Sequence, residues 1–554
     1  MIIVRLVFLL FIVAFGFIMH RLFVIQVLSS DHYIPIQKFV TVIKDLSLRG
    51  EIFDTNNSPL AVNTQVFTVY GNTDKLRKEY TIRQELQNIL RIKNSTMSAI
   101  LDREEWQKMK TGISTDTKDK IKQYYPTYIN IEDEWVRAYP EGSMSAQVLG
   151  FVGRDDIGNP KGYVGVEGYF EQELRGLPSV SERESDLRGV SFIGGVSNGA
   201  SGRAGMSLRL TIDRNLQKIV EDRLYKGVEQ YDAKQGCAIV MEPYTGKIRA
   251  IGCVPSFSPE KYFEYKDADF TNGLISTIYE PGSTFKPLIV AMGLDTKSIK
   301  ADEIFDEEGP LSIGEYDIRT WNNEYSGRIS TTQVLEKSSN VGMVQIIQNI
   351  KKQSVNDYLN NLGFREKTGI EIQGEAVGIV KNSSEWYPID YATISFGQGI
   401  AITPIQLVSA FSSLANDGYV VKPTLVENIT DSSGERVYTS STVNKRTVYS
   451  PKTVSTMKKM LNSAIENSEA IYPQKPEGYS FCGKTGTAQI PIEGHYDPSK
   501  TIASFIGFFP CDKPKMLVFV MYKEPAGSIW GSETAAPTFF EIAKRLILYY
   551  NIAP

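Results

Sequence analysis

The stretch Pro281-Gly-Ser-Thr-Phe-Lys-Pro-Leu-Ile289 constrains this chain more than any other. Pro281-Gly282 is typical of a turn, and Pro287 is tolerated only in or near the first turn of a helix, where a missing N–H costs little. A helix is therefore expected to begin close to Ser283. Residues three apart share a helix face, so the amine of Lys286 can reach back towards the Ser283 hydroxyl. The spacing predicts a serine nucleophile activated by a lysine, at the positive end of a helix dipole that can stabilise an oxyanion.

The histidine content favours lysine as the base. His20, His32 and His495 are the only histidines, and the first two lie in or beside an apolar run, so a Ser-His-Asp relay is nearly excluded. Ser-x-x-Lys alone is a weak signal, because it also occurs at Ser258/Lys261 and Ser455/Lys458.

Two later motifs strengthen the prediction. Ser338-Ser339-Asn340 follows a helix-like segment that begins near Thr331, and Lys484-Thr485-Gly486-Thr487 follows the strand-like run 479–482. A glycine at 486 would let a substrate backbone approach closely. Similar triplets occur at 354–356 and 367–369, but the second is more typical of a turn, whereas Lys484 lies next to strand candidates at 503–509 and 516–522.

In this order the three motifs resemble those of the penicillin-binding proteins. The segments 236–250, 396–404 and 535–537 are similar to other recurrent parts of that family. The resemblance implies an α/β (α+β) fold, the penicillin-recognising serine transferase fold, in which a central antiparallel sheet is flanked by helices. It covers residues 206–554 strongly, which we predict to be the transpeptidase domain, and the helix capped by Asp213 is expected near its start.

The region before residue 206 is expected to hold an anchor and a pedestal. Residues 1–28 are nearly all apolar and favour an uncleaved single-pass membrane helix over a signal peptide. Residues 29–205 resemble the elongated pedestal (dimerisation-type) domain of class B members, through the segments 49–54, 137–142 and 165–168. The family's usual Asp-Arg-Asn-Gly run is Asp54-Thr-Asn-Asn57 here, and a Gly/Ser-rich stretch, Gly189–Gly205, is typical of a linker. No glycosyltransferase signature precedes residue 206, so a monofunctional enzyme is expected.

The resemblance also implies roles for individual residues. Ser283 would form an acyl-enzyme from D-alanyl-D-alanine of a peptidoglycan stem peptide, an amine of a second stem would resolve it, and β-lactams would acylate the same serine. Lys286 would be the base, and Lys484 would supply the positive charge that lowers its pKa. The other implied site residues are Ser338, Asn340, Thr485, Gly486 and Thr487.

Composition excludes other classes. The net charge is −4 and no basic cluster or stacking-aromatic motif is present, so nucleic acid is not an expected partner. The four cysteines show neither metal-ligand nor redox spacing, and they suit small core positions, with a disulfide left open. Neither a metal nor a cofactor is expected. His495 lies in a polar segment, 491–500, predicted to be a loop, and Trp321 and Trp530 are expected to pack or to line a groove.

Several alternatives remain at this stage. Gly478–Thr485 matches the phosphate-binding pattern G-x-x-x-x-G-K-[ST], but that loop needs a strand before its first glycine and a helix directly after its threonine. A penicillin sensor, a carboxypeptidase or β-lactamase, and a catalytically silent scaffold share the expected fold. The family also implies a bacterial cell-membrane location with an extracytoplasmic catalytic domain. A polytopic membrane glycosyltransferase and a division or elongation complex are the implied partners, and the choice between division, elongation and sporulation is not encoded in any interpretable residue.

Overall fold

The computed structural model describes residues 2–28, 39–45, 47–185, 198–200, 202–440, 445–492 and 495–554. The chain divides into two units, Met1–Ser47 with Leu177–Arg203, and Leu48–Gly176 with Ala204–Pro554. The linker predicted at Gly189–Gly205 falls largely outside the described residues.

The first unit contains one long apolar helix and a small sheet. The helix runs as α1 (Ile2–Phe23) and continues as the π-helical segment η1 (Val24–Leu28). Together they span 27 residues and contain an 18-residue window with a mean hydropathy of 2.9, so the helix is long enough and apolar enough to cross a bilayer. The sheet is antiparallel and consists of β1 (Phe39–Asp45), β8 (Ser179–Ser185) and β9 (Asn198–Ala200).

The second unit contains a seven-stranded sheet in the order β19-β18-β10-β2-β3-β4, with β5 also pairing with β3. Its strands are β2 (Ile52–Phe53), β3 (Pro59–Asn72), β4 (Trp106–Ile113), β5 (Ile129–Ala138), β10 (Ser207–Leu210), β18 (Val426–Thr430) and β19 (Arg436–Thr439). β10 is parallel to β2, and the other pairs are antiparallel. The sheet therefore takes strands from both sides of residue 206, where we predicted a domain boundary.

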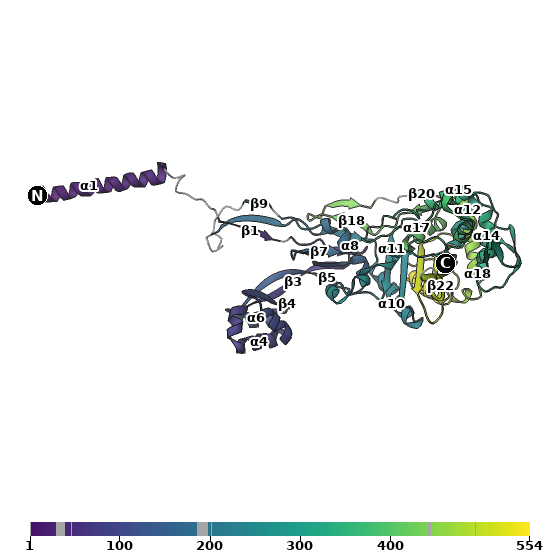
Figure 1. The fold of residues 1–554 in the computed structure, drawn as a ribbon, viewed down its shortest axis with the longest axis horizontal. Coiled ribbons are helices and arrows are strands. Elements are labelled where there is room, and N and C mark those ends of the chain that lie inside the picture. The colour runs from purple at the N-terminus through teal and green to yellow at the C-terminus, as the bar shows by residue number, and fades with distance from the viewer. Residues whose placement is uncertain are drawn as a thin grey trace. The chain divides into compact units, whose positions relative to one another are not determined.

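A small lobe with its own core is built on β3, β4 and β5 (Figure 1). Its helices are α3 (Thr73–Lys78), α4 (Tyr80–Leu90), α5 (Asn94–Leu101) and α6 (Thr115–Tyr124). The side chains of Asn72 and Ser114 accept hydrogen bonds from the first turns of α3 and α6, which fixes where these helices begin. Val69, Leu86 and Ile121 are fully buried in the lobe.

Four charged residues form a buried group that we call the pedestal ion cluster: Arg49, Arg137, Glu167 and Glu171. Glu167, which has no exposed side-chain surface, accepts from Arg49 Nε at 2.6 Å and from Arg137 Nε at 2.7 Å. A second contact, of 2.7 Å, joins Arg49 Nη2 to a carboxylate oxygen of Glu171. The three sequence segments that resembled pedestal motifs therefore meet at one site. The short elements around it are α7 (Ala146–Leu149), β6 (Phe151–Arg154), β7 (Pro160–Tyr163), α8 (Gly165–Tyr169) and α9 (Glu171–Leu174).

The atypical run Asp54–Asn57 keeps its turn and its contacts. Asn57 adopts a φ of +62°, a left-handed conformation that asparagine tolerates better than most residues other than glycine. Asp54 accepts from the N–H groups of Asn56 and Ser58, and Arg249 donates to Thr55 Oγ1 at 3.1 Å. The departures from the family pattern in this run have therefore not removed its contact with the rest of the unit.

A five-stranded antiparallel sheet in the order β12-β11-β23-β22-β21 forms the centre of the catalytic region. Its strands are β11 (Gln235–Met241), β12 (Ile248–Val254), β21 (Cys482–Ile492), β22 (His495–Phe509) and β23 (Met516–Lys523). Alternate side chains enter two different cores: Val518 and Val520 pack in one, and Leu517 and Phe519 in the other. This alternation is the period of two expected for a sheet covered on both faces.

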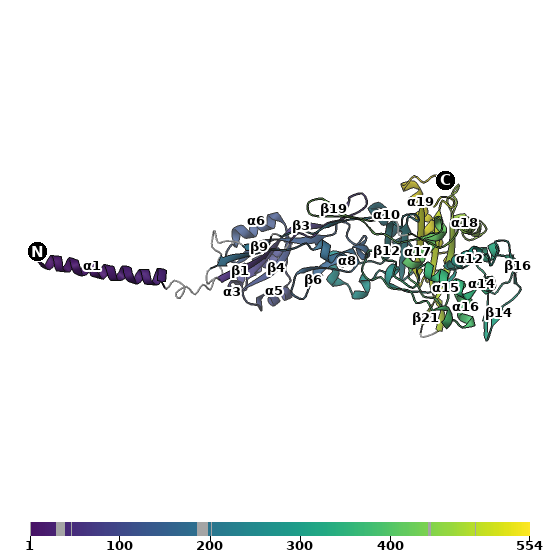
Figure 2. The same ribbon diagram turned by 90° about the horizontal axis from the view of Figure 1, so that it is seen from above.

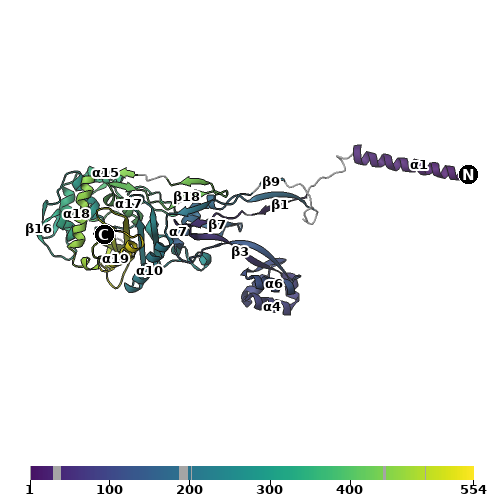
Figure 3. The same cartoon turned by 180° about the vertical axis from the view of Figure 1, so that it is seen from behind.

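Helices cover both faces. One face carries α10 (Arg214–Gln230) and α19 (Ala535–Tyr549), which contact each other (Figure 3). The other core includes α12 (Lys286–Asp295) and α17 (Pro404–Ala415). Every residue of α12 from 286 to 293 is buried, so this helix lies inside the fold.

The remaining elements surround α12. Figure 2 shows α12, α14 and α16 grouped together near β14 and β16. The longer helices are α13 (Thr331–Glu336), α14 (Asn340–Gln348), α15 (Lys352–Asn361), α16 (Pro388–Ile394) and α18 (Pro451–Glu466). The short strands are β13 (Ile304–Glu307), β14 (Leu311–Ile313), β15 (Tyr316–Ile318), β16 (Gly327–Ser330), β17 (Tyr419–Val421) and β20 (Lys445–Thr447). The short helices are α11 (Gly273–Ser276), η2 (Pro259–Glu264), η3 (Asp267–Phe270), η4 (Gly282–Thr284), η5 (Ser383–Glu385) and η6 (Tyr472–Gln474).

Two element predictions were wrong. Lys484-Thr485-Gly486 lies inside β21 and does not follow a strand, because β21 begins only at Cys482. The segment 491–500 was predicted to be a loop, but β21 extends to Ile492 and β22 begins at His495, so most of it is a hairpin. Polar composition alone does not distinguish an exposed hairpin from a loop.

All four cysteines are paired. Cys237 and Cys253 are disulfide-bonded across the register of β11 and β12, and Cys482 is bonded to Cys511, just after β22. They are buried, as predicted for small core residues, and the pairing that the sequence left open is resolved.

Candidate active site

Ser283 lies in the 3-10 turn η4, directly before helix α12. Pro287 occupies the first turn of α12, as its missing N–H requires. The α-helix thus begins at Lys286 and not at Ser283. Ser283 is half-buried, whereas Thr284 next to it is fully buried and donates to the Pro281 carbonyl at 2.7 Å. The turn therefore fixes the backbone and leaves the Ser283 hydroxyl accessible.

Lys286 is fully buried and points at the connection between α13 and α14. Its Nζ donates to the Ser338 carbonyl at 2.6 Å, to Asn340 Oδ1 at 2.8 Å and to Ser338 Oγ at 3.2 Å. We expected direct contact with Ser283, but no hydrogen bond joins the two residues among those the structure describes. Ser338 Oγ instead donates to Ser283 Oγ at 3.1 Å. Ser338 therefore connects the lysine to the candidate nucleophile.

The short segment from Ser338 to Asn340 is held in an unusual geometry. Ser338 has a φ of +55°, a left-handed conformation that costs a non-glycine residue about 1–2 kcal/mol. Ser339 then caps α14 by accepting from the N–H of Gly342. Asn340 Nδ2 donates to the Arg319 carbonyl at 3.0 Å, which orients its oxygen towards Lys286. The strained turn thus directs both the hydroxyl of Ser338 and the amide of Asn340 at one amine.

Lys484 brings a second buried amine to the site. It is 4% exposed, and burial lowers its pKa to about 8. Burial, together with the charge of Lys484, lowers the pKa of Lys286 well below its usual value. Two protonated amines buried close together repel each other, so the state of lower free energy keeps one of the amines neutral. A neutral amine near neutral pH is what a general base needs.

The strand β21 places three predicted residues beside the serine. Gly486 has no room for a side chain, because an added Cβ would lie 2.8 Å from Thr284 Cγ2 and 2.6 Å from Ser504 Oγ. Lys484 Nζ donates to Thr485 Oγ1 at 3.2 Å, and the hydroxyl of Thr487 accepts from the Gly531 N–H at 3.2 Å. All eight predicted site residues lie on η4, the start of α12, the α13–α14 connection, the first residue of α14 or β21.

Comparisons with known proteins identify the family. Residues 236–544 match the penicillin-binding protein transpeptidase domain, and residues 44–210 match the penicillin-binding protein dimerisation domain. The chain belongs to the penicillin-binding proteins. The arrangement of the two matches is that of class B, and the enzyme is a transpeptidase.

Individual relatives agree with this assignment. The chain is 29% identical to stage V sporulation protein D of Bacillus subtilis over 91% of its own length and 79% of the relative's. It is 28% identical to the peptidoglycan D,D-transpeptidase FtsI of Escherichia coli, over 98% and 90% of the two chains. The crystal structure of penicillin-binding protein 3 of Mycobacterium tuberculosis with aztreonam shares its fold, with a TM-score of 0.71, 23% identity, and coverage of 93% and 98%.

In this penicillin-binding protein, the segment Phe396–Gly399 has a role that the sequence did not reveal. The N–H of Gly282 donates to the Gly397 carbonyl at 3.1 Å, and a Cβ on Gly397 would lie 2.2 Å from the Gly282 carbonyl oxygen. The side chain of Glu280 accepts from the N–H of Gly399 at 2.9 Å. The loop therefore packs directly on the turn that carries Ser283, and this close approach explains the glycine at 397.

Two tryptophans approach each other from separate loops. The rings of Trp321 and Trp530 lie 5.0 Å apart, edge to face. Trp321 follows Arg319, whose carbonyl holds Asn340, and Trp530 precedes Gly531, whose N–H donates to Thr487. The pair therefore links the loops on the two sides of the site, which agrees with the packing or groove-lining role predicted for it.

The competing motifs do not form comparable sites. Strand β21 begins at Cys482, inside the pattern, and continues past Thr485 to Ile492 where a phosphate-binding loop would need a helix, so the nucleotide-binding pattern is not met. Residues 367–369 lie in an irregular segment outside any helix or strand, with Gly369 at φ +77°, and Ser354 and Asn356 lie within α15. Ser455 is exposed on α18, and Lys458 Nζ on the same helix donates to the Asp512 carbonyl at 3.2 Å. Within the described ranges, no group of three or more potential metal ligands occurs.

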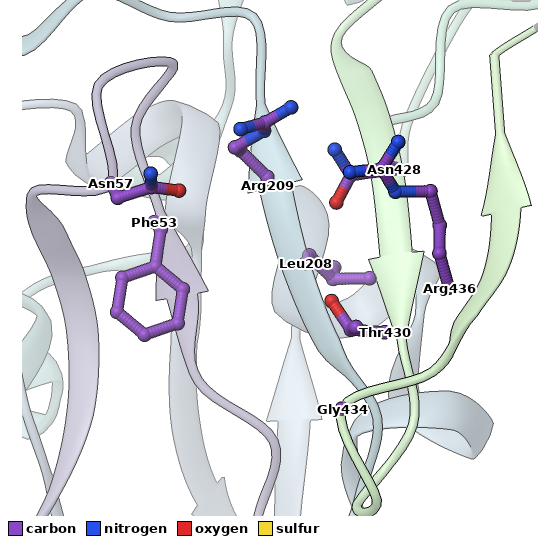
Figure 4. A pocket seen from close by; sticks show the side chains of 8 residues that line it. All are labelled: Phe53, Asn57, Leu208, Arg209, Asn428, Thr430, Gly434 and Arg436. Carbon is purple, nitrogen blue, oxygen red and sulfur yellow. The ribbon is translucent and has the colours of Figure 1, made fainter.

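A separate pocket of about 350 Å³ lies where β2, β10, β18 and β19 meet (Figure 4). It is lined by Phe53, Asn57, Leu208, Arg209, Asn428, Thr430, Gly434 and Arg436, and contains none of the predicted site residues. Arg209 in this pocket is paired with Glu427 at 3.1 Å. The chemistry of the serine is therefore not located here.

Proposed function

We propose that this chain is a peptidoglycan D,D-transpeptidase that cross-links stem peptides through an acyl-enzyme on Ser283. The observation that carries the proposal is the continuous hydrogen-bonded connection from Ser283 Oγ through Ser338 Oγ to Lys286 Nζ. Each hydroxyl in this connection can both donate and accept, so a proton can leave Ser283 as Oγ attacks and arrive at a neutral lysine.

The proposed reaction has two stages, acylation of Ser283 and transfer of the acyl group to an acceptor amine. Ser283 Oγ attacks the carbonyl carbon of the penultimate D-alanine, and its proton passes to Lys286 through Ser338. The bond to the terminal D-alanine then breaks, and the leaving amine takes the proton back by the same route. An amine of a neighbouring stem then attacks the ester carbonyl carbon and gives up a proton to Lys286. The new amide bond forms, the ester bond to Ser283 Oγ breaks, and that proton passes through Ser338 to Ser283 Oγ. Asn340 positions Lys286 and is also placed to contact the substrate's peptide amide.

The remaining site residues bind the two negatively charged groups, the terminal carboxylate of the donor and the oxyanion that forms during attack. Thr485 and Thr487 would bind the terminal carboxylate of the donor, with Lys484 supplying positive potential. The backbone N–H groups of Ser283 and Thr487 would form the oxyanion hole, and the packing of Gly282 against Thr487 and Ala488 supports their proximity. Each such donor is worth about a hundredfold in rate or more.

Membrane attachment and partners are proposed from the family. We place α1 in the membrane as a single-pass anchor, with the catalytic region outside the cytoplasm, residues 29–205 as the pedestal and residues 206–554 as the transpeptidase domain. A polytopic membrane glycosyltransferase and a division or elongation complex would work with it. A sensor or a silent scaffold would lack the transfer step, and a carboxypeptidase or β-lactamase would use water.

Intact-mass measurement of the full chain with benzylpenicillin tests the nucleophile. The wild type should gain one covalent adduct, and Ser283→Ala should gain none. Ser455→Ala is the matched control, since Ser455 belongs to another Ser-x-x-Lys motif on an exposed part of α18, and it should be acylated like the wild type. No adduct on well-folded wild type would contradict the proposal and favour the scaffold.

The acceptor is tested separately with a D-alanyl-D-alanine stem peptide and an amine acceptor. Formation of the cross-linked product supports transpeptidation. Hydrolysis alone, with acylation intact, would indicate a carboxypeptidase.

A further inference from the structure

A buried carboxylate that interacts with Lys286 has no role in the scheme above. Glu307 is the last residue of β13 and is only 2% exposed. Its Oε2 accepts from the Ser326 N–H at 3.1 Å, and its Oε1 is buried with no hydrogen-bond partner among the residues the structure describes. An ionised carboxylate in this position is costly unless a nearby positive charge compensates for it.

The position of β13 directs Glu307 towards the catalytic centre. Gln345 of α14 joins the helix to β13, because it donates to the Asp306 carbonyl at 2.5 Å and accepts from the Asp306 N–H at 3.2 Å. The same helix begins with Asn340, which accepts from Lys286. Ser326, which binds Glu307, lies on the segment that also carries Arg319, the anchor of Asn340. The carboxylate is thus built into the support of the Lys286 contacts.

Burial and Lys484 lower the pKa of Lys286, and the charge of Glu307 raises it. The catalytic centre therefore holds two buried amines and one buried carboxylate. With both amines protonated the group carries a net charge of +1, and with one protonated it is neutral. Without the carboxylate, each of these states would carry one more positive charge in a medium of low dielectric.

Other charged groups on the elements packed around Lys286 are already engaged. Asp306 and Arg328 pair with each other at 3.7 Å on the exposed face of β13 and β16. Glu336 on α13 accepts from Ser463 and Asn467. Asp295, at the opposite end of α12, accepts from Tyr358 and Thr453. Lys337 is exposed.

We propose that Glu307 is a positioning residue of the catalytic centre, whose buried carboxylate supplies a counter-charge for Lys286. The proposal rests on the proposed role of Lys286 as the base. Glu307 acts through the lysine and touches no reacting atom. Glu307 keeps Lys286 protonated at pH values where, without the carboxylate, one of the two amines would already have lost its proton. The carboxylate therefore sets how far acylation persists towards acidic pH.

Glu307→Gln tests this directly, because it removes the charge and keeps the shape. The second-order rate constant for acylation of the full chain in detergent by benzylpenicillin would be measured from about pH 5 to about pH 10. Losing the carboxylate lowers the pKa of Lys286, so the acidic limb of the profile should move to lower pH. If that limb lies one pH unit lower, the variant is about tenfold faster than the wild type at the same acidic pH. The alkaline limb should stay in place, because burial is what lowers the pKa of Lys484.

Glu308→Gln is the matched control. It makes the same change of charge one residue later, at an exposed position, and should leave both limbs where they are in the wild type. Glu307→Leu is a second neutral variant in case the glutamine variant does not fold, since an apolar side chain of similar size often replaces a buried charge without loss of stability. Melting temperatures check the folding of each variant.

The outcomes separate this inference from the proposed function. An acidic limb that moves down in either neutral variant, and not in Glu308→Gln, supports it. An unmoved or raised limb in a folded neutral variant overturns it while leaving Ser283 as the nucleophile. Acylation that survives Ser283→Ala would overturn the proposed function itself.

Discussion

In the pedestal, Glu167 is held between two arginines, whereas in the catalytic centre Lys286 lies near a second lysine. Both groups are almost completely removed from water. In the pedestal ion cluster each charge has an opposite charge within about 2.7 Å, so the cluster joins three segments of chain. In the catalytic centre burial, followed by the like charge of Lys484, lowers the pKa of Lys286. The balance of buried charge thus distinguishes a structural cluster from a reactive one.

Removing a member of each group should produce opposite effects, and Lys286→Met should have the largest. We expect acylation by benzylpenicillin to slow about 10³–10⁴-fold, because the general base is lost. The free energy of unfolding should be unchanged or higher, because a buried cation has been replaced by an apolar chain. A stopped-flow acylation assay and urea unfolding give the two numbers. A large loss of stability would show that Lys286 is mainly structural.

Glu167→Gln should act mainly on stability. It removes the carboxylate that pairs with buried Arg137 and leaves Arg49 with Glu171 alone, which is expected to cost about 3–5 kcal/mol of unfolding free energy. The folded fraction should still be acylated at a rate close to that of the wild type. Glu104→Gln, at an exposed position of the lobe, is the control and should change stability by less than about 0.5 kcal/mol. If Glu167→Gln and Glu104→Gln changed the free energy of unfolding equally, the pedestal ion cluster would not be a structural counterpart of the catalytic centre.

Double-mutant cycles measure the sign of each interaction. Arg137→Met combined with Glu167→Gln should be less destabilised than the sum of the single variants by about 2 kcal/mol, because opposite charges are removed together. Lys286→Met with Lys484→Met should show the opposite sign, since removing either lysine already relieves the repulsion. Unfolding free energies of the four single and two double variants provide the test, and the same sign in both cycles would break the comparison.

The smallest effect is expected from pH. Because the pKa of Lys484 is lowered to about 8, its ammonium group is lost above that pH, and acylation should fall about tenfold for each further pH unit. Lys484→Arg keeps its charge and should move this alkaline limb upward, at some cost in rate from the different head group. A limb that remains near pH 8 in the arginine variant would assign it to another group.

The sequence was sufficient for the parts that depend on short spacings. The turn and helix around Ser283, the cap of α10 by Asp213 and the strands at 503–509 and 516–522 were all predicted from residue types, and the structure has them. These features depend on neighbours in the chain, where proline, caps and alternation act directly. The roles of the individual site residues stay predictions.

Features that depend on distant contacts could not be predicted. The route from Lys286 to Ser283 passes through Ser338, and it depends on a left-handed serine that no propensity favours. The three pedestal segments were recognised one at a time, but nothing in their spacing indicated that Arg49, Arg137 and Glu167 meet. Glu307 stands at an inward position of a short strand, where an apolar side chain is the ordinary expectation, and only its burial reveals it.

The sheet that takes strands from both sides of residue 206 has a practical consequence for anyone dissecting this protein. A fragment that begins at 206 would keep β10 but lose β2, its parallel neighbour, and with it the bonds that cover that side of β10. The backbone N–H and C=O groups of Leu208 and Arg209 would then form an unpaired sheet edge, which could pair with a second copy of the fragment. We therefore expect such a fragment to aggregate or to form artificial dimers because β2 is missing. A fragment that starts at Leu48 keeps β2 and should not.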